Sequence, residues 1–147
     1  MENNIDLNSN VIRISIDGDE NRVIKFDPND SLFAEKFYKS CHEIDVKQSA
    51  FYRRVEELNS HKKELDDNGI PKNVGDGIAF LKDVCDFMRG QVDYLFGNGT
   101  AQMVFGDSRN LETISSFFVQ LKPYFERGRE KKIEKYTRNR HKPNVMK

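Results

Sequence analysis

Apolar and polar residues alternate near the N-terminus, as they do in a β-strand with one buried face. Ile12, Ile14 and Ile16 fall on one side of the first run, and Arg22–Phe26 alternates after a turn-rich stretch, so the pattern predicts a β-hairpin over 11–26. A lone two-stranded hairpin is only marginally stable in water, so this isoleucine face must pack on helices or on strands of another copy. The first ten residues show no periodicity and are expected to be disordered.

Beyond the hairpin, apolar residues recur three and four positions apart, which is the spacing of amphipathic helices. The pattern predicts helices over about 31–66, 75–96 and 109–127, with a short helix starting at Thr100. These elements indicate a single domain over 11–126. We expect a mainly α protein with a small N-terminal β-hairpin, an α+β fold whose helices form a bundle of about four.

Several local signals refine these helices. Asp30 is a good N-cap for the first one, and the stretch His42–Asp45 could interrupt it. Gly97 is suited to end the middle helix. Pro123 lies inside the last helix and is expected to kink or divide it, because proline removes a backbone hydrogen bond. The middle helix has the clearest apolar face, which we expect to be core and which consists of Ile78, Leu81, Val84, Cys85, Met88, Val92 and Leu95.

The composition is that of a soluble protein with a charged surface. Of 147 residues, 37% are hydrophobic and 33% are charged, which allows one core without a metal or disulfide. No run approaches the length of a membrane helix, and the start lacks a signal-peptide pattern, so we expect a cytoplasmic protein. Cys41 and Cys85 have no partner at metal-binding spacing and are expected to be small buried hydrophobic residues.

Charge is distributed unevenly along the chain. Residues 127–147 contain nine basic and two acidic residues, a net charge of +7, which leaves −7 for residues 1–126 because the whole chain sums to zero. This basic tail is expected to be partly helical or disordered. It has a single aromatic residue, Tyr136, and no recognisable nucleic-acid module, so we do not expect nucleic acid as a partner. A small DNA-binding regulator acting through the tail remains an alternative, as does docking on an acidic surface.

Catalytic chemistry has no visible basis in this sequence. His42 adjoins Cys41, but neighbouring helical residues point apart, and the other two histidines lie in charged stretches. Asp83, Asp86 and Asp93 have no histidine at the spacing of a metal site. We therefore expect no enzyme activity, no cofactor and no metal.

The most distinctive segment is VDYLFGNGTAQMVFGD, which covers residues 92–107. A phosphate loop would need a Gly-Lys-Ser/Thr ending or a preceding strand, and this segment has neither. Two glycines permit a tight reversal, and the apolar residues around them can fold back on the core. The sequence therefore predicts a structural corner built by Leu95, Phe96, Gly97, Gly99, Thr100, Phe105 and Gly106.

This segment resembles a pattern found in the tail assembly chaperones of long-tailed, siphovirus-like phages and prophages of Gram-positive bacteria. The order of hairpin, Phe-rich helices and basic end is similar too, so the resemblance covers roughly residues 11–136. It implies a protein that binds the tape measure protein, keeps it soluble and helps recruit tail tube subunits. Such a protein would act in the cytoplasm of the bacterial host and would not remain in the mature virion.

Candidate contacts with a partner are aromatic residues on two helices. They are Phe51 and Tyr52 on the first long helix and Phe117 and Phe118 on the last, with core packing as the alternative for each. A homo-oligomer is also expected, since the hairpin face needs cover. An alternative function is a structural head-tail connector or tail-completion protein, which would be present in purified particles.

Overall fold

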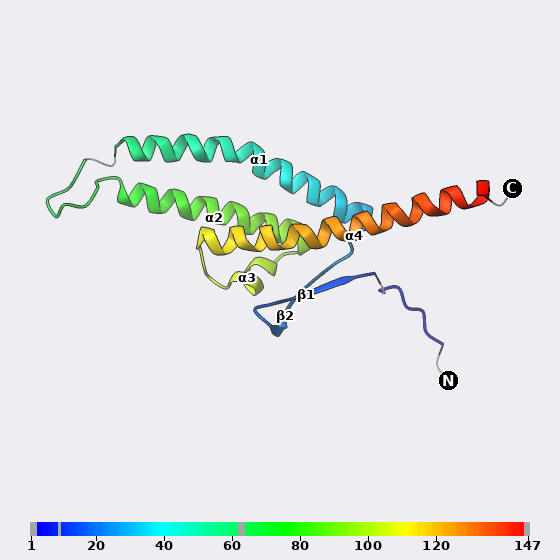
Figure 1. The fold of residues 1–147 in the computed structure, drawn as a ribbon. Helices are drawn as coiled ribbons and strands as arrows, with labels where there is room; N and C mark the ends of the chain where they lie inside the picture. Colours follow the sequence, from blue (N-terminus) through cyan, green and yellow to red (C-terminus); the bar gives the residue numbers. More distant parts are fainter. Residues whose placement is uncertain (1–2, 9, 62–63, 146–147) are drawn as a thin grey trace. The chain divides into compact units, whose positions relative to one another are not determined.

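The structure, a computed structural model, describes residues 3–8, 10–61 and 64–145, with the backbone alone for 129–145. The elements are β1 (Ile12–Ile16), β2 (Asp19–Phe26), α1 (Ser31–Ser60), α2 (Val74–Phe96), α3 (Thr100–Phe105) and α4 (Leu111–Val145) (Figure 1). The predicted fold class, mainly helical with an N-terminal hairpin and four helices, is confirmed. The chain divides into two compact units, which are described separately: the hairpin unit, residues 1–35 with 116–147, and the helical unit, residues 36–115.

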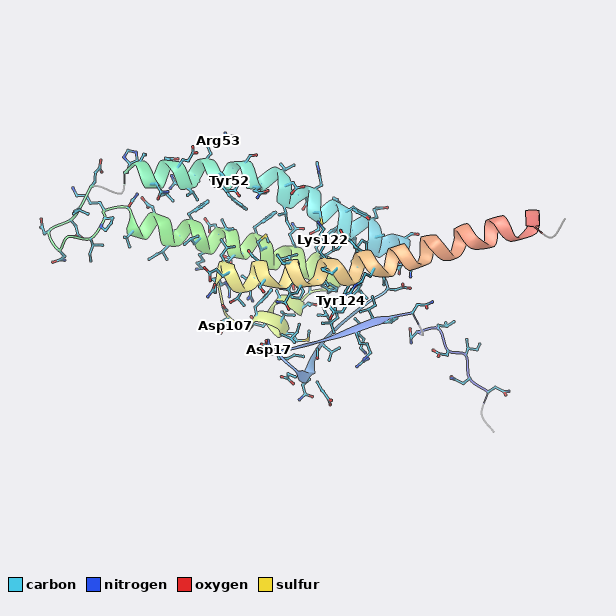
Figure 2. The ribbon with its side chains drawn as sticks, viewed as in Figure 1. Asp17, Tyr52, Arg53, Asp107, Lys122 and Tyr124 are labelled. Carbon is cyan, nitrogen blue, oxygen red and sulfur yellow. The ribbon has the colours of Figure 1, made fainter. Side chains whose placement is uncertain are left out.

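The hairpin is tighter than its sequence suggested. Asp17 and Gly18 connect antiparallel β1 and β2, and both have a positive φ, 53° and 73°. A two-residue turn of this kind matches the twist of the two strands it joins. β2 therefore begins at Asp19, earlier than the predicted Arg22. Figure 2 labels Asp17 at this turn.

The apolar face of the hairpin is covered unevenly. Ile24 and Phe26 of β2 are buried. The rings of Phe26 and Phe33 stack with centroids 5.2 Å apart, and Phe33 lies 5.9 Å from Phe125 of α4. The inward residues of β1 are only half-buried: Ile12, Ile14 and Ile16. Side chains of the same chain thus cover the β2 side of the face better than the β1 side.

A glycine allows α4 to approach the segment between the hairpin and α1. Pro28 is fully buried, and a Cβ added at Gly128 would overlap its Cγ. Glycine in a helix costs roughly 0.5–1 kcal/mol relative to alanine. This close contact gives a physical reason for glycine at that position.

Of the two outcomes expected at Pro123, a kink or a division of the helix, division does not occur. The helix runs through it as one element as far as Val145. Proline removes the N–H that would bond the carbonyl of Val119, and Val119 is 72% exposed, so water can solvate that carbonyl instead. The basic tail is therefore helical as far as its backbone is described. Residues 146–147 lie outside the described residues, as do residues 1–2 and 9 of the expected disordered N-terminus.

In the helical unit, α1 and α2 run antiparallel and side by side (Figure 1). α1 continues through His42–Asp45 without the break considered above, and it ends at Ser60 rather than near residue 66. Asp30 caps its N-terminus, since its Oδ1 accepts a hydrogen bond from the N–H of Leu32 at 2.9 Å. The two helices thus form a long helical hairpin.

Apolar and polar contacts both join α1 to α2. The ring of Phe51 packs edge-on against Phe80 and Phe87, with centroids 6.1 Å and 6.0 Å away. Further along, the buried Ser40 hydroxyl donates to Oε1 of Gln91 at 2.6 Å, and Nε2 of Gln91 donates to Glu43 at 3.0 Å. Buried polar groups need partners, so this small network fixes the register of the two helices.

Candidate partner-binding site

α2 carries one apolar repeat along its whole length, but only the second part of it is covered. Val74, Ile78 and Leu81 are spaced four and three residues apart, and at about 100° per residue they share a face with Cys85 and Val92. Cys85 and Val92 are completely buried, whereas the exposed fractions of the first three residues are 41%, 63% and 47%. We call Val74, Ile78 and Leu81 the uncovered stripe.

Coverage of this face begins where the α3–α4 connection crosses α2. The Sγ of Cys85 donates to the carbonyl of Arg109 at 3.1 Å, and Nε of Arg109 donates to Asp86 at 3.0 Å. One turn further along α2, Nη1 of Arg89 donates to the carbonyl of Ser108 at 3.1 Å. These contacts lie at residues 85–89 of α2. The uncovered stripe lies on the N-terminal side of them, where the helix extends beyond the connection.

Two glycines in the first turn of α2 leave room beside the stripe. Gly75 and Gly77 would each have open space around an added Cβ within the described chain. A glycine inside a helix is less favourable than alanine by about 1 kcal/mol. Internal packing does not account for these two glycines. They would let the backbone of another helix approach closely.

The four aromatic residues chosen from sequence have different environments. The ring of Phe51 packs against Phe80 and Phe87 of α2. Tyr52 is 64% exposed, and its hydroxyl accepts a hydrogen bond from Gln48 at 3.3 Å (Figure 2). The half-buried Phe117 and Phe118 of α4 contact each other edge-on at 5.5 Å, and they belong to the other unit.

The sequence pattern did not reveal that Val74, Ile78 and Leu81 are exposed. Ile78 and Leu81 were assigned to the core because their spacing continues the repeat of buried residues. Periodicity identifies the apolar face of a helix, but it does not show how far along the helix a covering element extends. The helical glycines were the one available signal at this end of α2.

The motif segment forms the corner between α2 and α3. Gly97 and Gly99 have φ angles of 108° and 92°, and the N–H of Gly97 bonds the carbonyl of Asp93 at 2.8 Å. The carboxylate of Asp93 also accepts the N–H of Ala101 at 2.8 Å, at the start of α3. The hydroxyl of Thr100 donates to the carbonyl of Gly97 at 2.8 Å. A carboxylate at a helix N-terminus is electrostatically favourable, so Asp93 stabilises the corner.

A buried arginine holds the other end of α3. Arg89 is 8% exposed, and its Nη2 donates to Oε1 of Gln102 at 3.1 Å. Its guanidinium lies 5.9 Å from the centre of the Phe105 ring, and α3 ends at Gly106 with a φ of 60°. Leu95 is buried and Phe96 half-buried at the end of α2. The whole segment therefore works as a scaffold that positions the α3–α4 connection on α2.

Burial, more than the local charges, makes Cys85 a poor nucleophile. Burial raises the pKa of its thiol above the ordinary value, and the nearby Asp86 carboxylate raises it further, while Arg109 and Arg89 act in the opposite direction. A thiol with a raised pKa stays protonated at neutral pH. Among the described residues, no group of three His, Cys, Asp or Glu side chains could hold a metal ion.

A polar pocket of about 240 Å³ lies at the end of the helical hairpin where the chain passes from α1 to α2. Its lining residues are Arg54, Glu57, Leu58, His61, Glu64, Lys72, Asn73 and Asp76. Arg54 pairs with Glu57 at 2.8 Å on the surface. Asp76 is about half a helical turn from the uncovered stripe, so α2 has a polar and an apolar side here.

Comparison with known proteins gives a family but no function. A family model described as "Family of unknown function (DUF6673)" matches residues 20–147. This is most of the chain, so the protein belongs to this family. No curated protein and no solved structure matches the chain. Within the described residues, no helix is both long and apolar enough to cross a membrane.

Proposed function

We propose that the protein is a phage tail assembly chaperone. It binds the tape measure protein, keeps it soluble and helps recruit tail tube subunits. It acts in the cytoplasm of the bacterial host and is left out of the mature virion. The observation that supports this function best is the uncovered stripe on α2, whose three apolar residues keep exposed fractions of 41%, 63% and 47% within the described chain.

The stripe fits an amphipathic helix better than it fits a small molecule. Its three residues are spaced four and three apart, which is the spacing by which one helix presents anchors to another. Gly75 and Gly77 beside it have open space around an added Cβ and permit close approach of a second backbone. A long helical client with apolar residues at the same spacing would supply the missing cover.

The motif segment supports the proposal in a different way. Its residues are engaged in the corner between α2 and α3, as the bonds of Asp93 and Thr100 demonstrate. The part of the sequence that resembles tail assembly chaperones would then preserve the scaffold. The client would bind the part of α2 that this scaffold leaves open.

Co-expression with the tape measure protein of the same genome tests the function. We expect the tape measure protein to become soluble and to co-purify with the full chain. A tape measure protein that still precipitates alone would remove the support for a chaperone. Detection of the protein at fixed stoichiometry in purified particles would favour the structural connector or tail-completion protein instead.

Paired variants test the contact face in the same experiment. Ile78→Asp together with Leu81→Asp should abolish co-purification while leaving the far-ultraviolet circular dichroism unchanged, because both side chains are exposed. Val119→Asp introduces one negative charge at an exposed apolar position on α4, against two in the stripe variant, and should have no effect. Loss of binding in Tyr52→Asp, but not in the stripe variant, would move the contact to α1.

A further inference from the structure

Two apolar residues of the N-terminal segment lie two positions apart, too few to show as periodicity in the sequence, yet placed on one side of an extended chain. Ile5 and Leu7 alternate with polar neighbours over residues 3–8, and they are 82% and 83% exposed. Among the described residues, the sheet consists of β1 and β2 only, so the outer edge of β1 is unpaired. The exposed edge of a strand has unpaired backbone N–H and C=O groups, and an exposed extended segment can form hydrogen bonds with them.

The apolar face of the hairpin lacks cover at this same edge. Ile24 and Phe26 of β2 are 3% and 5% exposed, while the inward residues of β1 are half-buried. A strand added beside β1 would extend the face there. With Ile5 and Leu7 pointing inward, it would lie next to Ile14 and Ile12.

The segment does not reach the edge of its own β1. Its last residues form a turn in which the N–H of Val11 bonds the carbonyl of Asn8 at 3.2 Å. Figure 1 shows the segment leading away from the start of β1 and from the hairpin turn. The edge that this segment can cover therefore belongs to a second molecule.

We infer that two copies exchange their N-terminal segments, so that residues 3–8 of each pair antiparallel with β1 of the other. Asp6 is placed opposite Arg13, Ile5 opposite Ile14 and Leu7 opposite Ile12. Each copy then makes the same contact with the other, as a two-fold axis requires. The outer edge of each β1 is occupied by the partner's segment, so each hairpin becomes part of a three-stranded sheet in the order β2, β1, partner segment.

Charge and length both fit this register. Arg13 is exposed on the outer face of β1, and Asp6 would face it across the strands, which is a favourable cross-strand pair. In the free segment, the Asp6 carboxylate instead accepts the N–H of Asn8 at 3.1 Å. Six extended residues span roughly 20 Å at about 3.3 Å per residue, which is enough to cover the five residues of β1.

Sedimentation over a wide concentration range is the first test. The full chain should form a dimer, and Ile5→Asp with Leu7→Asp should weaken the dimer about tenfold or more, because four apolar cross-strand pairs are lost. Val119→Asp, an exposed apolar site outside the contact, should leave it unchanged. A chain that stays monomeric at every concentration overturns the inference, as does a dimer that the Ile5 and Leu7 variant does not weaken.

Disulfide trapping identifies the partner edge without disturbing the apolar residues. Equal amounts of an Asp6→Cys chain and an Arg13→Cys chain are mixed and oxidised. A disulfide between these two positions in different chains is expected, since opposed strand residues have the required Cα separation. A dimer without this cross-link uses another surface. In a single chain that carries both substitutions, a disulfide formed at low concentration shows that the segment folds back on its own β1. A dimer without the cross-link and a disulfide within one chain each overturn the inference.

Discussion

The two ends of α2 have the same sequence pattern and opposite environments. From Cys85 onward, the apolar face is buried by the motif corner and the α3–α4 connection. From Val74 to Leu81, the same face lies open. The first part of this face, Val74, Ile78 and Leu81, therefore adds little to the core, while the second part anchors the helical unit. The difference teaches that an amphipathic helix can combine a scaffold and a docking surface on one face.

The largest expected difference is between matched truncations at the two ends. Leu95→Ala removes a buried side chain and should lower the free energy of unfolding by about 2–5 kcal/mol. Ile78→Ala removes a side chain that is 63% exposed and should change it by less than about 0.5 kcal/mol. Urea denaturation followed by circular dichroism measures both. Equal losses at the two positions would mean that the stripe is covered in solution.

Two helical glycines extend the comparison to backbone contacts. Gly128→Ala should lower the free energy of unfolding by about 1–3 kcal/mol, because the new Cβ overlaps buried Pro28. Gly77→Ala should raise it by about 0.4–1 kcal/mol, since its surroundings are open and alanine restricts the unfolded chain. Thermal unfolding of both variants beside the wild type shows whether each substitution raises or lowers the stability. A destabilising Gly77→Ala would contradict the open surface.

The cap at the motif corner should have a smaller effect. Asp93→Ala removes the acceptor for the N–H of Ala101 and should cost about 1 kcal/mol. Asp83→Ala on the exposed side of α2 serves as the matched control and should cost less than about 0.5 kcal/mol. Hydrogen exchange at the Ala101 amide, expected to accelerate in the first variant alone, locates the change in α3. Unaltered exchange there would refute the role of Asp93.

The smallest effect concerns Cys85, which marks the first covered turn of α2. Its pKa is raised in the folded state, so at alkaline pH the unfolded chain loses the thiol proton before the folded chain does. Stability from this group is complete below the ordinary thiol pKa and falls as pH rises above it, by at most about 1.4 kcal/mol per pH unit. The decline in unfolding free energy from neutral to alkaline pH should be shallower in Cys85→Ala. Identical slopes would show that the thiol pKa is not raised.

The sequence alone determined the elements and the local geometry of the corner. Alternation at Ile12, Ile14 and Ile16 specified a strand, and repeats of three and four residues specified the helices, because both patterns follow from backbone periodicity. Gly97 lies at the end of α2 with a positive φ, a conformation that glycine adopts easily because it has no Cβ. These features depend on residues close together in the chain.

Tertiary structure decided which predicted faces are covered. Pro123 remains inside α4, which continues through it as one element, and the local sequence does not show this. Ile78 was assigned to the core by its spacing, yet the covering connection begins only at Cys85. The sequence fixes where apolar side chains lie on a helix. Burial also depends on where distant segments of the chain end, and that is set by long-range packing.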